Sequence, residues 1–546
     1  IMPKVLDLPE VHVGRCVFNR PFRHMTDFNV GEIIPLMYDC NITPGDSVQI
    51  PIKALIRMQT PLYPVADDLV FDVSAWFVPD RLTWKHFKNF WGENDTTFWE
   101  EETKYEIPQI EAPEGGWAEH SLADYLGIPT KVSGISTSHM PFRAYSMIWS
   151  EFWRDENLKE PIFYNTDDTT LTGKNYDATT YDYTIDTQLG AKPALAAKRA
   201  DYFTKSLPEP QKSEDVFIPL GNEAPIYGKD AGSTSPFDYE GNLFRSSDTY
   251  DKGWWTVKDK DGNTISQVDF NQTTGQPSVN GAAELYADLS SALGATVNQL
   301  RMAVALQRYA ETIARSGSRY IEILAGVFGV KSSDARLQRP EFLGGRSYPI
   351  SMAEIQNTAQ SSGNQLGNVG GMSKTIINDF LCSKSFEEHG TLMVLGVVRI
   401  KRHTYPQGLP RMLTRKAQMD FYNRALDHIG EEKVRLDQIY AQGTDDDETA
   451  FGYQPAFEDM RLGMSYCSGN MRPNATLTLA SWNYADDYSE APTLSSEWID
   501  EDKTLVDRTL TITSSTSPQI FGDFLFEMKH ARGMSMYGTP GFMDHM

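Results

Sequence analysis

Cysteine is scarce in this sequence, and its spacing argues against two kinds of stabilised fold. Four cysteines occur in 546 residues, and no two of them form the CxxC pair of zinc and redox sites. A secreted disulfide framework would hold more cysteines along a much shorter chain. We therefore expect reduced, mostly buried thiols in a protein made in the cytosol.

Long hydrophobic runs are lacking as well. The longest apolar stretches, such as 324–330 and 392–398, are interrupted by glycine and shorter than the roughly 20 residues of a membrane helix. The chain is nevertheless 40% hydrophobic, with 40 glycines and 30 prolines. That composition favours a soluble, β-rich and loop-rich fold with no membrane insertion, built as one large domain or two.

Positive charge is in deficit. Lys and Arg number 50 against 74 Asp and Glu, which gives a formal net charge of −24. Such an excess of acid argues against a chain that coats nucleic acid by itself. The deficit is uneven, because residues 297–435 hold 19 Lys and Arg against 12 Asp and Glu. One interpretation is an object that is acidic outside and less acidic inside.

The motifs of common enzymes and metal sites are missing from the sequence. It contains no HExxH and no GxSxG, and the glycines of 367–375 lack the spacing to Lys374 that a P-loop needs to hold a phosphate. The acidic run 445–448 lacks the alternating ligands of a calcium loop, which favours a solvated turn. We therefore predict no catalytic residue, no cofactor and no metal.

What the sequence does contain is strict alternation in two neighbouring stretches. Apolar residues alternate with other residues over 48–52 and again over 69–77. Successive side chains of a strand point to opposite faces, so these stretches predict two long strands with one face in a core. Trp76 and Val78 lie on the other face, which predicts that the end of the second strand is covered on both sides. Pro79 has no N–H to donate and should end this strand.

Aromatic residues crowd this strand and the segment that follows it, and two more lie in the C-terminal tail. Large aromatic side chains bury much area and often anchor one layer or subunit to another. We therefore predict packing or interface roles for these residues. They are Trp76, Trp84, Phe87, Phe90, Trp91, Tyr537 and Phe542.

Other segments predict further elements of the same fold. Residues 391–400 are nearly continuously apolar, as in a central strand, and 521–529 alternate as a half-buried strand does. Ser121 and Gly127 bound a short helix, and 141–153 form a longer, aromatic helix candidate.

Helical periodicity is clearest over 297–313, and a second helix is predicted over 320–328. We expect both helices to pack outside a sheet and to belong to the core. Residues 1–44 carry five prolines and predict an extended arm that runs over other elements or subunits.

The texture changes between about 155 and 290. This stretch is polar and rich in turn residues, which predicts an inserted, surface-exposed subdomain. Its Tyr, Ser, Asn and Gly suit a recognition surface. A plain solvated loop fits equally well, because long insertions cost little stability.

Basic residues gather just after the predicted central strand, with His403 and Tyr405 between them as possible stacking faces. An inward-facing cluster of this kind would meet the phosphates of packaged DNA. Ion pairs with the acidic remainder of the chain are the alternative. The DNA-facing candidates are Arg399, Lys401, Arg402, Arg411, Arg415 and Lys416.

Six short blocks, ordered along nearly the whole chain, carry a resemblance to a known family. The first begins with Phe77-Val78-Pro79-x-Arg81 and continues through the aromatic segment. The blocks are 77–91, 337–345, 385–390, 451–454, 492–494 and 537–545. Together they resemble the major capsid proteins of small single-stranded-DNA bacteriophages, the Microviridae, and among these the gokushovirus group.

This resemblance implies a mainly β fold, an eight-stranded antiparallel viral jelly roll with long loop insertions and a few peripheral helices. Residues 1–155 and 290–546 would form the shell domain with its arms. Residues 156–289 would be the inserted subdomain. Sixty copies would close into a T=1 icosahedral shell.

The resemblance also implies partners and not substrates. The shell would package circular single-stranded DNA, helped by a small basic DNA-binding virion protein. The insertion 156–289 would contact a receptor on the bacterial surface. The protein would be a virion component, assembled in the cytoplasm of the bacterial host, and it would not be an enzyme.

The content of Trp, Tyr and carboxylates leaves one competing hypothesis. A β-sandwich protein that binds carbohydrate or hydrolyses glycosides has a similar composition. Electron microscopy of the purified protein separates the two, because the first forms uniform shells and the second forms monomers or small oligomers.

Overall fold

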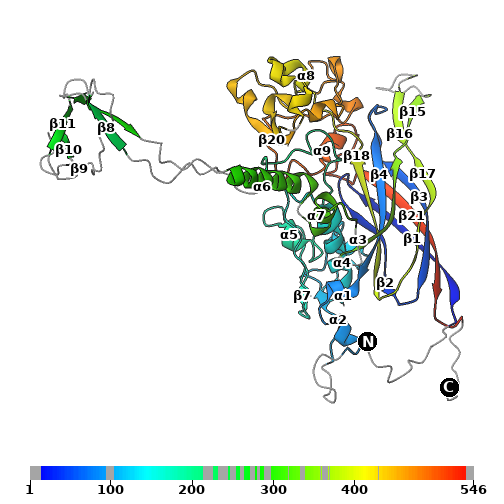
Figure 1. The fold of residues 1–546 in the computed structure, drawn as a ribbon. Coiled ribbons are helices and arrows are strands. Elements are labelled where there is room, and N and C mark those ends of the chain that lie inside the picture. Colours follow the sequence, from blue (N-terminus) through cyan, green and yellow to red (C-terminus); the bar gives the residue numbers. More distant parts are fainter. Residues whose placement is uncertain are drawn as a thin grey trace. The chain divides into compact units, whose positions relative to one another are not determined.

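The computed structural model describes residues 14–93, 104–212, 297–317, 319–331, 338–356, 369–427 and 429–536, with residues 358 and 367 and the backbone of short strands between 226 and 287 (Figure 1). The chain divides into two compact units. The first unit comprises Ile1–Pro210 and Ala314–Met546, and the second comprises Gln211–Ile313.

Two four-stranded antiparallel sheets form the centre of the first unit (Figure 1). One sheet has the order β1 (Cys16–Phe28), β21 (Ile520–Arg532), β3 (Ser47–Met58), β17 (Thr375–Ser385). The other has the order β14 (Glu341–Pro349), β4 (Leu69–Pro79), β18 (Gly390–Ile400), β2 (Ile34–Ile42).

One hydrophobic core lies between the two sheets. Buried and exposed residues alternate along β3, so that Val48, Ile50 and Ile52 face this core. Phe71 of β4 and Phe524 of β21 stack there with ring centroids 5.6 Å apart. The strands predicted from alternation over 48–52, 69–77 and 521–529 are therefore confirmed, and the fold is mainly β, as a two-layer β-sandwich requires.

The sheet that contains β4 and β18 is also covered on its outer face, and we call it the covered sheet. Every residue of β4 is buried. Trp76 and Val78 pack with Met393 and Leu395 of β18 against a helical layer. This confirms the predicted double coverage of β4, its end at Pro79, and the central position of β18, which pairs with both β4 and β2.

The helical layer contains α3 (Leu122–Tyr125), α4 (Met140–Ile148) and the π-helical turn η1 (Trp149–Trp153). The Ser121 hydroxyl caps α3 by accepting the Asp124 N–H at 3.2 Å. Gly127 follows in the left-handed region with φ of 77°, as a C-terminal glycine should. The short helix and the aromatic helix over 141–153 are confirmed.

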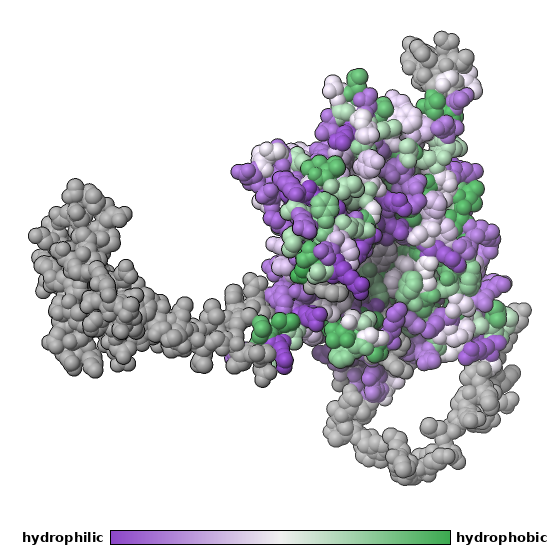
Figure 2. Space-filling model, turned by 45° about the horizontal axis from the view of Figure 1, so that its top comes forward, coloured by the Kyte–Doolittle hydropathy of each residue, from purple (hydrophilic) through white to green (hydrophobic). Residues whose placement is uncertain are grey.

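The other sheet exposes apolar side chains on its outer face, and we call it the open sheet. Met25 of β1, Ile376 and Phe380 of β17, and Phe521 of β21 are exposed. The strand register places all four on the face opposite the core. Figure 2 shows hydrophobic patches among hydrophilic ones along the right-hand side, where Figure 1 places this sheet.

The prediction of an extended arm over 1–44 that runs over other elements or subunits is wrong for the part of it that the structure describes. Residues 16–28 and 34–42 are strands β1 and β2 within the sheets. Each is the edge strand of its sheet, and an edge tolerates Pro21 and Pro35 because one side of the strand donates no ladder hydrogen bond. Proline therefore marked sheet edges in this case.

The two predicted helices exist, but their expected packing in the core is wrong. In α6 (Val297–Ser316), Leu300 and Val304 of the periodic apolar face are 45% and 50% exposed, and Ala310 of that face is buried. In α7 (Tyr320–Gly326) no residue is buried. Met302 and Leu306 of α6 are exposed as well, so apolar residues surround this helix and the pattern did not define one inner face.

The expected insertion 156–289 differs from the second unit, because residues 156–210 belong to the first. Ile162 lies in the helical layer, and Tyr202 and Phe203 form a third core cluster with Trp498. The second unit contains one sheet of order β12-β11-β10-β9 and one of β13-β8. These strands are β8 (Ile226–Asp230), β9 (Phe244–Arg245), β10 (Trp254–Lys258), β11 (Thr264–Phe270), β12 (Pro277–Val279) and β13 (Ala283–Ala287).

Smaller elements complete the first unit. Its short strands are β5 (Gln109–Glu111), β6 (Ser136–Ser138), β7 (Leu171–Thr172), β15 (Met352–Gln356), β16 (Val369–Ser373), β19 (Glu431–Arg435) and β20 (Ala450–Pro455). Its short helices are α1 (Asp80–Thr83), α2 (Phe87–Phe90), α5 (Tyr183–Asp186), α8 (Arg411–Thr414) and α9 (Thr504–Asp507). Among the described residues, no helix combines the length and the apolar character that crossing a bilayer demands.

Candidate nucleic-acid and assembly surfaces

The basic cluster begins at the end of β18, where Arg399 is bound inside the protein. Its guanidinium contacts Asp72 Oδ2 at 2.5 Å and donates to the Ala197 carbonyl at 3.1 Å. It also lies 5.2 Å from the centre of the Trp153 ring. These contacts fix Arg399 to the covered sheet and leave little of its charge for an external phosphate.

Arg411 and Arg415 are also held by internal ion pairs. Arg411 forms an ion pair with Glu432, and Arg411 is buried. Arg415 Nη2 lies 2.7 Å from Asp459 Oδ2, and both side chains are less than one-tenth exposed. For these two residues and Arg399, the geometry favours the salt-bridge alternative that the sequence left open.

Lys401, Arg402 and Lys416 are exposed. Lys401 Nζ lies 2.7 Å from Asp68 Oδ2, but both side chains face solvent, and such pairs contribute only about 0–1 kcal/mol. Contact with DNA remains a prediction for the whole cluster, and these three residues are the ones placed to make it.

The prediction that His403 offers a stacking face is wrong, because its side chain is wholly buried. Its Nδ1 lies 3.0 Å from Asp486 Oδ2 and its Nε2 lies 3.4 Å from Glu501 Oε2. Burial by itself would lower the pKa of His403, but the two carboxylates raise it to about 10. The imidazolium is therefore a structural cation. Tyr405 is half-buried and donates to Asp201 Oδ2 at 2.8 Å.

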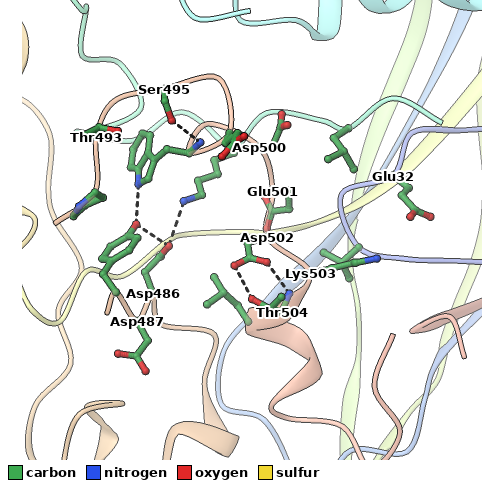
Figure 3. Close-up of a pocket in the computed structure, with 18 of the residues that line it drawn as sticks. Glu32, Asp486, Asp487, Thr493, Ser495, Asp500, Glu501, Asp502, Lys503 and Thr504 are labelled. Carbon is green, nitrogen blue, oxygen red and sulfur yellow. Dashed lines mark hydrogen bonds and ion pairs between the residues drawn. The ribbon is translucent and has the colours of Figure 1, made fainter. Parts of the chain in front are cut away.

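Asp486 also borders an acidic hollow of about 640 Å³ (Figure 3). Lys198 Nζ lies 3.3 Å from Asp486 Oδ1, and the Tyr488 hydroxyl donates to the same oxygen at 3.1 Å. Burial would raise the pKa of Asp486, but Lys198 and His403 hold it below its usual range. This carboxylate is bound by protein cations, which does not suit the acid or base of a glycosidase.

Two of the predicted aromatic residues are packing residues inside the subunit. Trp76 donates to Ser74 Oγ at 2.8 Å, and its ring centre lies 4.3 Å from that of Phe152. Trp84 is fully buried and donates to Asp168 Oδ1 at 2.5 Å. Their indole N–H groups are satisfied internally, so they do not need a second subunit.

Phe90, the last residue of α2, and Trp91, which follows it, lie at the surface. Trp91 is 58% exposed, and one face of its ring stacks on His389 at 4.1 Å. Phe87 is half-buried and meets Trp91 edge to face. We call Phe87, Phe90, Trp91 and His389 the aromatic corner. Tyr537 and Phe542 lie outside the described residues.

The exposed apolar face of the open sheet is the surface that the sequence analysis missed. A signal for it exists in β17, where Ile376 and Ile377 are adjacent apolar residues and therefore point to opposite faces. Only Ile377 is buried. An apolar residue on both faces of a strand is typical of a strand that is covered on both sides, and among the residues that the structure describes only the core side is covered.

Comparison with known proteins shows the family to which the chain belongs. The profile of the capsid protein (F protein) family matches residues 7–542. The chain belongs to the capsid protein (F protein) family.

Its relatives among capsid proteins match over nearly their whole length. Capsid protein VP1 of Spiroplasma virus 4 is 37% identical over 97% of this chain and 96% of the relative. Capsid protein VP1 of Bdellovibrio phage phiMH2K is 36% identical, over 98% and 96%. Capsid protein VP1 of Chlamydia phage 1 is 31% identical, over 98% and 97%.

Membership of this capsid family confirms the resemblance found in the sequence blocks. The chain is a major capsid protein, a structural component of a virion and not an enzyme. Capsid subunits assemble with copies of themselves, so the aromatic corner and the exposed face of the open sheet are candidate contacts between subunits.

Proposed function

We propose that this capsid protein closes into a T=1 icosahedral shell of sixty copies around a circular single-stranded DNA genome. The observation that carries the proposal is the exposed apolar surface of a chain whose family forms capsids. A closed shell needs heterologous contacts, in which one surface meets a different surface of the next copy. The aromatic corner and the open sheet are two such surfaces.

We infer that the two sheets form a viral jelly roll. Along the chain, β1, β3, β17 and β21 enter the open sheet, while β2, β4, β14 and β18 enter the covered sheet. First and last strands pair as β1 and β21, and the central pair β4 and β18 joins distant parts of the chain. This interleaving supports the double Greek key of a jelly roll.

We further propose that the inserted region, expected at 156–289, attaches the particle to a receptor on the host bacterium, and that the second unit, Gln211–Ile313, makes this contact. Its separate sheets and polar, Tyr-rich sequence support a recognition role. A small basic virion protein would help to neutralise the packaged DNA, because the chain itself carries a net charge of −24. Assembly would take place in the host cytoplasm.

The assembly role of the aromatic corner is tested by Trp91→Ser. The matched control is Tyr466→Ser, because Tyr466 is another highly exposed aromatic residue. Electron microscopy and sedimentation should show shells for the control and unassembled, folded subunits for W91S. Normal shells from both variants would remove Trp91 from the subunit interface.

The attachment role is tested by replacing Gln211–Ile313 with a short Gly/Ser linker. The prediction is intact shells that no longer adsorb to cells of the host bacterium. Loss of assembly, with folded subunits, would show instead that the second unit is part of the shell architecture.

A further inference from the structure

A second hollow, of about 340 Å³, opens where the exposed part of the basic cluster begins. Three segments line it, namely 199–203, 401–405 and 462–465. All three belong to the first unit. We call this the basic hollow, and its size is that of a pocket for one small ligand.

The side chains that line the basic hollow carry mostly positive charge, whereas those that line the acidic hollow carry mostly negative charge. Arg199, Lys401 and Arg402 line the basic hollow, and the one carboxylate among its lining residues is Asp201. This carboxylate already accepts hydrogen bonds from neighbouring residues of the chain. Its Oδ1 accepts the N–H groups of Phe203 and Thr204 at 2.9 and 2.8 Å, and its Oδ2 accepts the Tyr405 hydroxyl.

Arg199 is available to an incoming anion because its own partner is shared. Its Nη1 lies 3.2 Å from Asp72 Oδ1, yet the same carboxylate is held by Arg399 at 2.5 Å and accepts the Ser347 hydroxyl. One carboxylate cannot balance two guanidinium groups, and the Arg199 side chain is one-third exposed. A phosphate that reached this mouth would meet Arg199 and Arg402 with charge-assisted hydrogen bonds.

Most of the remaining lining is aromatic or apolar, with Ser465 and the buried His403 as the polar exceptions. Tyr202, Phe203 and Tyr405 line the hollow, and the ring centres of Phe203 and Tyr405 lie 4.7 Å apart. Leu462 and Met464, both partly exposed, pack against the same hydrophobic cluster. A lining that combines cations with flat and apolar groups matches a ligand that has both a phosphate and a ring.

We propose that the basic hollow binds one nucleotide unit of single-stranded DNA, with the phosphate at Arg199 and Arg402 and the base against the surface formed by Tyr405, Leu462 and Met464. The inference rests on the proposed packaging of single-stranded DNA. The proposed contact with DNA lies in a defined pocket. Three cations of the predicted cluster, Arg399, Arg411 and Arg415, instead form ion pairs inside the subunit.

The first test measures oligonucleotide binding to purified subunits. The double variant Arg402→Ala with Arg199→Ala should weaken binding of a ten-residue oligothymidylate at least tenfold. The charge-matched control is Lys374→Ala with Arg424→Ala, two exposed basic residues outside both the hollow and the predicted basic cluster, and it should change the affinity less than twofold. Equal losses in both variants would overturn a specific site and leave only general charge attraction.

A second variant keeps the charges and tests the ring contact. Met464→Ala should weaken oligothymidylate binding a few-fold without changing the slope of affinity against salt, because no phosphate contact is lost. Thymidine monophosphate should compete with the oligonucleotide at concentrations where inorganic phosphate does not. Equal competition by phosphate or by a sulfated polysaccharide would overturn recognition of a nucleotide.

The last test separates this inference from the proposed function. Particles grown with 5-bromodeoxyuridine in their DNA should crosslink under ultraviolet light to residues 462–465 or Tyr405, as mapped by mass spectrometry. Particles that contain DNA but crosslink elsewhere would overturn the basic hollow and leave the packaging proposal intact. Particles that contain no DNA would overturn packaging itself.

Discussion

The covered sheet and the open sheet share one core but differ on their outer faces. Outside the covered sheet, Trp76 and Leu395 are buried beneath α4 and its neighbours. Outside the open sheet, Met25 is 68% and Ile376 is 70% exposed. The helical layer of the chain covers one outer face, whereas the other is uncovered in the described part of the chain. We infer that this second face is available for contact with a neighbouring subunit.

The largest predicted effect is on the covered sheet. Trp76→Ala removes a buried indole that packs on both Phe152 and Phe342, and such changes cost about 3–5 kcal/mol. Phe521→Ala on the open sheet is the control and should stay within about 0.5 kcal/mol. Urea denaturation of the purified subunit measures both, and equal losses would erase the difference between the sheets.

The next effect is a loss of stability in acid from the layer over the covered sheet. Burial and the neighbouring Arg143 guanidinium lower the pKa of His139 to about 4 from its ordinary 6.5. The unfolded chain therefore takes up this proton first, and about 3 kcal/mol is lost as pH falls from 6.5 to 4. His139→Gln should flatten this part of the profile of unfolding free energy against pH.

His403, at the end of β18, predicts the opposite dependence. Its folded pKa of about 10 lies above the ordinary value of 6.5, so the folded state holds the proton more tightly. Its contribution is complete below pH 6.5 and declines as pH rises toward 10. His403→Gln should therefore reduce stability at neutral pH and lessen the loss in alkali. A profile that the substitution leaves unchanged would contradict the buried imidazolium.

A smaller effect is expected from charged pairs on the open sheet. Lys53 and Glu527 meet at 2.9 Å across neighbouring strands, but both side chains are about half exposed. Lys53→Ala should cost less than about 1 kcal/mol, and that cost should vanish in high salt. A loss of several kcal/mol would mean that this face is not open to solvent in the subunit.

The sequence predicted the parts of the fold that follow from local patterns. Alternation in β3, continuous burial in β18 and the Ser121 cap of α3 each have a signal within a few residues. The burial of His403 has none, because its partners Asp486 and Glu501 are far along the chain. The pairing of β1 with β21, across almost the whole sequence, likewise has no local signature.

The candidate surfaces were predicted less well than the strands. The bunching of six basic residues did not reveal that Arg411 and Arg415 meet Glu432 and Asp459 in the fold. Arg199 follows Lys198 in the sequence, but this short basic pair lies far from the predicted cluster, and only the structure shows that Arg199 and Arg402 line the same hollow. Charge in sequence indicates where cations are, and only the folded chain shows which of them are already neutralised.

We infer that the outer face of the open sheet becomes covered when subunits assemble. Hydroxyl-radical labelling of Met25, Ile376 and Phe380, read by mass spectrometry, compares free subunits with purified particles. Strong labelling is expected in free subunits and clear protection in particles, while Trp76 stays unlabelled in both. Equal labelling of the three side chains in free subunits and in intact shells would contradict it.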